Sequence, residues 1–355
     1  MDKQLLDLYT DYLVASFGAT TATGLARLLD GTVSHDQSTR FLAKRQFTSA
    51  DRWQVVKPTV RLVQHPDGVL SIDETSEEKP YTDERELVCW HFDHSTDRTV
   101  KGINVLSTLD CVNAVVLPVA VALVTKTETV IDKKTGKEQT RSAVTKNEHY
   151  RTMLRACVHN QIPFRYVLNA IWLAAAEHMK LITNELEQDF VMPLKRNRKV
   201  ALRREEQQQG LYQAGGTLEL EPGVVREVWL EGVDFPVVLA KPVFTNGDGS
   251  LGILSLVTSD TTLDFGQRTA LYQTRWQVEE YHTSLKSNLA LCKSPTRTTV
   301  TQTNPVIGTR WAFVKLELLR VQTTSTHFAL KTKLYMAALR TAVEQLQALE
   351  PHRLT

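Results

Sequence analysis

The sequence contains few cysteines and no long apolar run. Its four cysteines, Cys89, Cys111, Cys157 and Cys292, lie far apart and form no Cys-x-x-Cys pair. This spacing argues against a zinc ribbon or a disulfide framework, and it favours a protein of a reducing cytoplasm. No apolar stretch approaches the roughly 20 residues that a membrane span requires, and the polar start, Met-Asp-Lys-Gln, is unlike a secretory signal. We therefore expect a cytoplasmic protein without a membrane partner.

The sequence also lacks a strong charge of either sign. Its 42 Lys and Arg residues against 40 Asp and Glu residues give a formal net charge of +2, so composition alone does not indicate a nucleic-acid-binding protein. The positive residues are nevertheless concentrated in two stretches, which either contact phosphates or form solvated helix faces; charge alone favours the second reading. Their members include Lys195, Arg198 and Lys199 in the first stretch, and Lys286, Lys293, Arg297 and Arg310 in the second.

The hydrophobic pattern divides the chain into five parts and predicts an α/β protein. Its 355 residues are long for one compact core and fit two or three subdomains. Residues 1–65 have a helical pattern, and residues 66–189 alternate short apolar strands with helices. Residues 190–265 are rich in Val, Thr, Gly and Pro and predict a mostly β insertion. Residues 266–322 return to a helical pattern, and residues 323–355 predict a C-terminal helix.

Two short helices near the start resemble a helix-turn-helix. Residues 23–31 form an apolar-periodic run closed by a glycine, and Ser34 with Gln37 then has the pattern of a capping box. In a helix-turn-helix the second helix contacts DNA, which makes Arg40 and Lys44 candidate contacts. The alternative is a plain structural helical hairpin, which is the more common outcome for such a pair.

Two segments carry acids that could serve catalysis. Tyr272, Arg275, Glu279 and Lys286 are separated by intervals that return to one face of an α-helix. A carboxylate flanked by cations suits a metal site that also binds phosphate, although a solvated helix face has the same pattern. Asp73 ends the apolar run 68–73 and would point into a cleft at the edge of a sheet, or simply form a turn.

These motifs, taken in order, resemble the DDE transposases of bacterial insertion sequences. The segments Asp73-Glu-Thr, Trp90-His-Phe-Asp-His94 and Val100-Lys-Gly-Ile-Asn104 fit that family, and Tyr272 to Lys286 match the Tyr-Arg-Glu-Lys signature of one large branch. The resemblance extends from about Tyr9 to Leu319. It implies an RNase H-like core, a mixed sheet flanked by helices, divided between residues 66–189 and 266–322. By resemblance, Asp73 is the first catalytic acid and Glu279 is the third.

The second acid of the resemblance is missing. It should follow the strand 164–168, two residues before an aromatic residue, and Ala170 occupies that position ahead of Trp172; Asn169 is a weaker candidate. The chain is then an engineered Asp→Ala knockout, a naturally decayed or repurposed transposase, or a sequence that we have aligned out of register. We favour the knockout, because the rest of the signature is intact.

The resemblance also implies an activity and its partners. The parent enzyme would bind transposon ends and target DNA as a homodimer, and would cleave and transfer strands with two Mg²⁺ or Mn²⁺ ions in the nucleoid of a bacterial cytoplasm. This chain would then be catalytically inactive. The alternatives are a domesticated DNA-binding protein without catalysis and, less favoured, a protein unrelated to nucleic acid. The predicted DNA contacts are Tyr272, Arg275, Lys286, Lys293, Arg297, Lys195, Arg198, Lys199, Arg40 and Lys44.

Overall fold

The computed structural model describes residues 2–29, 31–93, 96–133, 136–221, 223–245 and 249–349. His94, which belongs to one of the motifs of the resemblance, lies outside this part of the chain. The chain divides into two compact units: unit 1 comprises residues 1–56, 79–85 and 280–355, and unit 2 comprises residues 57–78 and 86–279. No described helix is long and apolar enough to cross a membrane.

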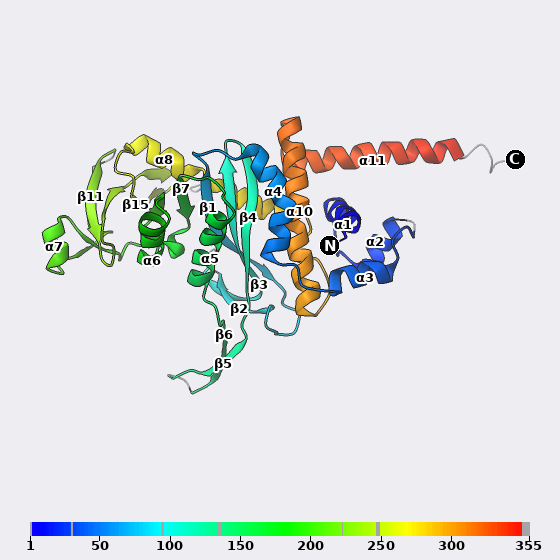
Figure 1. Ribbon diagram of the computed structural model, residues 1–355, viewed down its shortest axis with the longest axis horizontal. Coiled ribbons are helices and arrows are strands. Elements are labelled where there is room, and N and C mark those ends of the chain that lie inside the picture. Colours follow the sequence, from blue (N-terminus) through cyan, green and yellow to red (C-terminus); the bar gives the residue numbers. More distant parts are fainter. Residues whose placement is uncertain are drawn as a thin grey trace. The chain divides into compact units, whose positions relative to one another are not determined.

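Unit 1 is helical (Figure 1). It contains α1 (Lys3–Ala15), α2 (Ala22–Leu28), α3 (His35–Ala43), α10 (Thr299–Thr323) and α11 (His327–Leu349), together with the first part of α4 (Ser49–Val63) and the last part of α9 (Trp276–Asn288).

The start of α3 is the predicted capping box. The backbone N–H of Gln37 donates to the Ser34 hydroxyl, and the Gln37 side chain accepts from the Ser34 backbone N–H, so two otherwise unpaired donors are satisfied. Further along, α1 packs closely on α10 because residue 308 is a glycine. A Cβ at Gly308 would lie 2.8 Å from a ring carbon of Tyr9.

Unit 2 is built on one large mixed sheet. Its strands follow the order β10-β9-β11-β12-β15-β8-β7-β1-β3-β2, and β4 also pairs with β3. The pairs β1–β7 and β7–β8 are parallel and the other pairs of this sheet are antiparallel. The strands are β1 (Val69–Glu78), β2 (Cys89–Asp93), β3 (Arg98–Val112), β4 (Val115–Val124), β7 (Tyr166–Asn169), β8 (Asp189–Pro193), β9 (Lys199–Ala201), β10 (Gln213–Ala214), β11 (Val225–Leu230), β12 (Pro236–Ala240) and β15 (Leu256–Thr258).

Helices flank this sheet, and α5 (Lys146–His159) contacts β3 and β4 while α8 (Phe265–Gln273) contacts β8 (Figure 1). The mixed sheet with flanking helices confirms the predicted fold class. The remaining elements are a 3₁₀ turn at Ile171–Leu173, α6 (Ala176–Lys180), a π turn at Leu181–Glu185, α7 (Arg204–Gln208) and two hairpins outside the main sheet, β5 (Glu128–Ile131) with β6 (Glu138–Arg141) and β13 (Val243–Thr245) with β14 (Leu251–Ile253).

The regular elements of the predicted β-rich stretch 190–265 are strands apart from α7, and most of these strands extend the main sheet. β15 pairs antiparallel with β8, the outermost of the three parallel strands, and β12, β11, β9 and β10 continue from it. Val237, Leu239 and Val257 are fully buried, so the burial of apolar side chains stabilises β12 and β15 within the sheet.

Two predictions about the acid-bearing elements were wrong in detail. Asp73 does not end its strand, because β1 continues to Glu78, where backbone pairing with β3 sustains a strand whose side chains become polar. The segment with Tyr272 and Glu279 is not one helix either. It breaks between α8 and α9 at Thr274 and Arg275, where the backbone N–H groups of Arg275 and Gln277 bond three residues back instead of four.

Candidate active site

Asp73 lies within β1 at the point where parallel pairing with β7 stops. The last pair in the parallel register is Ile72 with Asn169. Asp73 as a whole residue is 7 % exposed. Burial raises the pKa of its carboxyl to about 7, although a hydrogen bond from the Glu74 backbone N–H (2.8 Å) and the nearby Arg275 guanidinium both act to lower that pKa. β1 therefore holds a carboxyl that has little contact with solvent.

Ala170 comes next to Asp73 in this register. It follows the last residue of β7 directly, and its backbone is still extended, with φ −70° and ψ 158°. Opposed residues of parallel strands point to the same face, on strands about 4.8 Å apart. A side chain at position 170 therefore projects on the same side of the sheet as Asp73, whereas Asn169 shares the other side with Ile72.

Glu279 reaches the same region from the first turn of α9. One guanidinium nitrogen of Arg275, Nη1, lies 3.1 Å from Asp73 Oδ2 and 3.1 Å from Glu279 Oε1. The side chains of Asp73, Arg275 and Glu279 are 9 %, 17 % and 42 % exposed, so the cluster opens to solvent on the side of Glu279. The structure thus brings together Asp73 and Glu279, the two acids that the sequence predicted. The group between them is Arg275, which the sequence predicted as a DNA contact.

Tyr272 supports this cluster from α8. Its hydroxyl donates to the backbone carbonyl of Asn169 at 3.3 Å, and the Arg275 guanidinium lies over its ring, 5.7 Å from the centroid. Burial raises the pKa of the Tyr272 phenol to about 12, so the hydroxyl is a donor at neutral pH. Tyr272 therefore fixes the end of β7, immediately before position 170, and holds Arg275 over its ring.

The basic stretch around residue 195 is partly engaged within unit 2. The Arg198 guanidinium donates to the backbone carbonyl of Glu231 at 2.8 Å, and Lys199 forms an ion pair with the Glu231 carboxylate at 2.8 Å. Lys195 is exposed. Two of these three predicted DNA contacts therefore also join β9 to the end of β11.

The other predicted contacts belong to unit 1. Lys286 lies on α9 beyond Glu279, and Lys293 and Arg297 follow α9 with exposed side chains.

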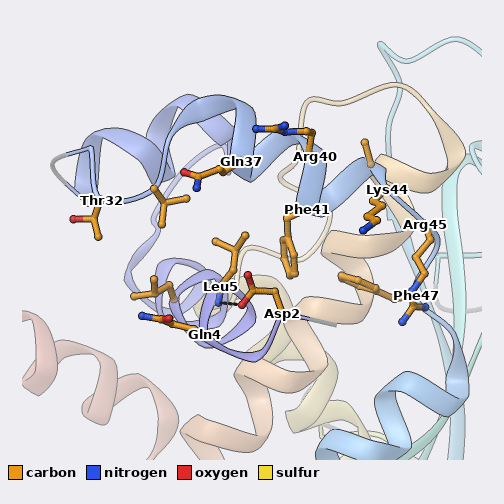
Figure 2. A pocket seen from close by; sticks show the side chains of 13 residues that line it. Asp2, Gln4, Leu5, Thr32, Gln37, Arg40, Phe41, Lys44, Arg45 and Phe47 are labelled. Carbon is orange, nitrogen blue, oxygen red and sulfur yellow. Dashed lines mark hydrogen bonds between the residues drawn. The ribbon is translucent and has the colours of Figure 1, made fainter.

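Arg40 on α3 and Lys44 at its C-cap are exposed, and both line a hollow of about 880 Å³ between α1 and α3 (Figure 2). Apolar side chains form part of its wall, with Phe41 pointing from α3 toward α1 (Figure 2). They are Leu5, Leu8, Val33, Phe41 and Phe47.

The donor chemistry of the cluster fits one divalent ion. Asp73 and Glu279 supply the carboxylate oxygens that Mg²⁺ and Mn²⁺ prefer. Position 170 carries a methyl group and supplies no ligand, and the described residues contain no group of three His, Cys, Asp or Glu side chains that could hold a metal. The residues present therefore do not complete a site for a pair of ions.

Comparison with known proteins identifies the family. A family model described as DDE superfamily endonuclease matches residues 2–218, which include Asp73 and Ala170 and end before Glu279. A search of curated proteins found no match to the chain. The match covers more than half of the chain, and the mixed sheet flanked by helices is consistent with the fold of such nucleases. The chain belongs to the DDE superfamily of endonucleases.

Proposed function

We propose that this endonuclease-family chain is a DNA transposase of the bacterial insertion-sequence type, in the branch with the Tyr-Arg-Glu-Lys signature. The observation that carries the proposal is the convergence of Asp73 and Glu279 on one guanidinium nitrogen, at 3.1 Å each, beside the strand end that carries position 170. A strand and a distant helix that bring carboxylates together suit phosphodiester chemistry.

In this proposal each part of the cluster has a separate task. Asp73 and Glu279 would hold one divalent ion, and in a completed site a pair of such ions would supply activation of the attacking hydroxyl and stabilisation of the leaving oxygen. Tyr272 keeps the end of β7 in place through the Asn169 carbonyl. The exposed cations Arg40, Lys44, Lys195, Lys293 and Arg297 would bind phosphates of the transposon ends and the target. Two copies of the chain would act together on paired ends, in the bacterial cytoplasm.

The chain in its present form would bind DNA without cutting it. Ala170 directly follows the end of β7, next to Asp73 in the parallel register, and its side chain offers no oxygen. A second ion therefore lacks the ligand that would be shared with Asp73. The same observation favours a second candidate function, a DNA-binding protein that has no catalytic step. The two candidates differ in what happens when a carboxylate is restored at that position.

The experiment is a nicking assay on supercoiled plasmid with Mn²⁺. Ala170→Asp should nick at least about a hundred times faster than the parent chain, since even supporting residues of metal sites change activity by 10–100-fold. Asn169→Asp is the matched control, because its side chain shares the other side of the sheet with Ile72. Nicking by Asn169→Asp alone would show that our register is displaced, and no nicking by either variant would favour the non-catalytic function.

A further inference from the structure

The Arg275 guanidinium lies where its positive charge would repel any metal ion bound to Asp73 and Glu279. Its Nη1 atom lies 3.1 Å from both Asp73 Oδ2 and Glu279 Oε1. A Mg²⁺ or Mn²⁺ ion on either oxygen would sit about 2.1 Å from it, and hence within about 5 Å of that nitrogen. Two positive groups at this distance repel strongly in a site where the guanidinium is 17 % exposed.

The local backbone allows this guanidinium to leave. Arg275 lies in the break between α8 and α9, outside both helices, and its partner Glu279 is 42 % exposed, so one side of the ion pair faces solvent. The ring of Tyr272 lies against the guanidinium and offers a contact that does not depend on either carboxylate. A change of the Arg275 side chain alone would therefore free one oxygen of each carboxylate, Asp73 Oδ2 and Glu279 Oε1, from the guanidinium.

We propose that Arg275 is the internal counter-ion of Asp73 and Glu279, and that it competes with divalent metal for them until DNA phosphate draws it away. The proposal rests on the proposed function, which supplies the metal and the DNA. Arg275 is then a positioning residue. Its guanidinium holds the Asp73 and Glu279 carboxylates together before metal binds, and it moves to a DNA phosphate when metal takes its place. Metal and DNA binding are thereby coupled, each favouring the other.

The test is calorimetric titration of the DNA-free chain with Mn²⁺. We expect Arg275→Gln to lower the Kd for Mn²⁺ by at least about tenfold, because it removes a unit positive charge next to the ligands. Arg155→Gln is the matched control. Arg155 also forms an ion pair with an acid of unit 2, Glu185, at 2.9 Å, and its removal should leave the Kd unchanged.

A second measurement tests the coupling. Double-stranded DNA at saturating concentration should tighten Mn²⁺ binding to the parent chain, and this gain should be lost in Arg275→Gln. Equal or weaker Mn²⁺ binding by Arg275→Gln would overturn the inference, and so would a gain from DNA that Arg275→Gln retains in full.

One further pair of variants separates this failure from failure of the proposed function. Ala170→Asp should bind Mn²⁺ in a manner abolished by Glu279→Gln in the same chain. If that binding is present while Arg275→Gln has no effect on the Kd, only the role of Arg275 is wrong. If Ala170→Asp binds no Mn²⁺ that depends on Glu279, the metal-dependent function itself is wrong, and the role of Arg275 fails with it.

Discussion

Replacement of Asp110 by Asn should change how the stability of the protein depends on pH. Asp110 lies in β3 opposite Leu70 of β1, is 1 % exposed, and neither carboxyl oxygen has a hydrogen-bond partner among the described residues. Its Oδ1 atom lies close to the backbone of Gly68, 3.4 Å from where a Cβ would stand. Burial without a compensating donor raises the pKa of Asp110 to about 7 from 3.8.

The direction in which stability changes with pH follows from proton binding to Asp110. Between about pH 4 and pH 7 the folded protein keeps the Asp110 proton that the unfolded chain has released. The neutral carboxyl therefore contributes fully to stability below about pH 4, and that contribution is lost as the pH rises through about 7. Each pH unit in this window corresponds to about 1.4 kcal/mol, and the whole window to about 4 kcal/mol.

The assay is urea unfolding of the parent and of Asp110→Asn at a series of pH values from 4 to 8. The amide stays neutral throughout, so the variant should gain stability relative to the parent by about 1.4 kcal/mol per pH unit up to pH 7. Asp97→Asn, at an exposed turn in the same unit, should show no such gain. A difference between Asp110→Asn and the parent that is the same at every pH would refute the reasoning.

Two further predictions concern unit 1. Asn304 is fully buried and makes three hydrogen bonds to the backbone at and just after the end of α3, of which that from the Phe47 N–H measures 2.6 Å. Asn304→Ala should lower the free energy of unfolding by about 3 kcal/mol in urea denaturation. A loss under about 1 kcal/mol would contradict this. Arg40→Ala and Lys44→Ala should each weaken binding to all DNA sequences and reduce the slope of log K against log salt by about 1 in fluorescence anisotropy. An unchanged slope would remove α3 from the DNA-binding surface.

Much of the fold was accessible from the sequence because local patterns determine it. The apolar runs that became β1 and β7 have fully buried residues such as Leu70 and Val167, and the capping box at Ser34 marks the start of α3 correctly. Each of these signals is carried by neighbouring residues, so hydrophobic period and capping chemistry were sufficient.

The details that were missed depend on pairing between distant segments. The polar half of β1 has the composition of a loop, because its strand conformation is sustained by hydrogen bonds to β3 and not by buried apolar side chains. The break at Thr274 and Arg275 has no glycine or proline to announce it. Arg275 and Asp73 are 202 residues apart in the sequence, and the helical spacing that selected Arg275 as a phosphate ligand contains no sign that its guanidinium binds Asp73.

The most direct measurement of the central claim is anomalous X-ray diffraction from crystals of Ala170→Asp soaked in Mn²⁺. We expect two manganese peaks about 4 Å apart, flanked by the side chains at positions 73, 170 and 279. The Arg275 guanidinium should have moved away from both Asp73 and Glu279. Manganese peaks elsewhere on the molecule, with Arg275 still bridging Asp73 and Glu279, would contradict it.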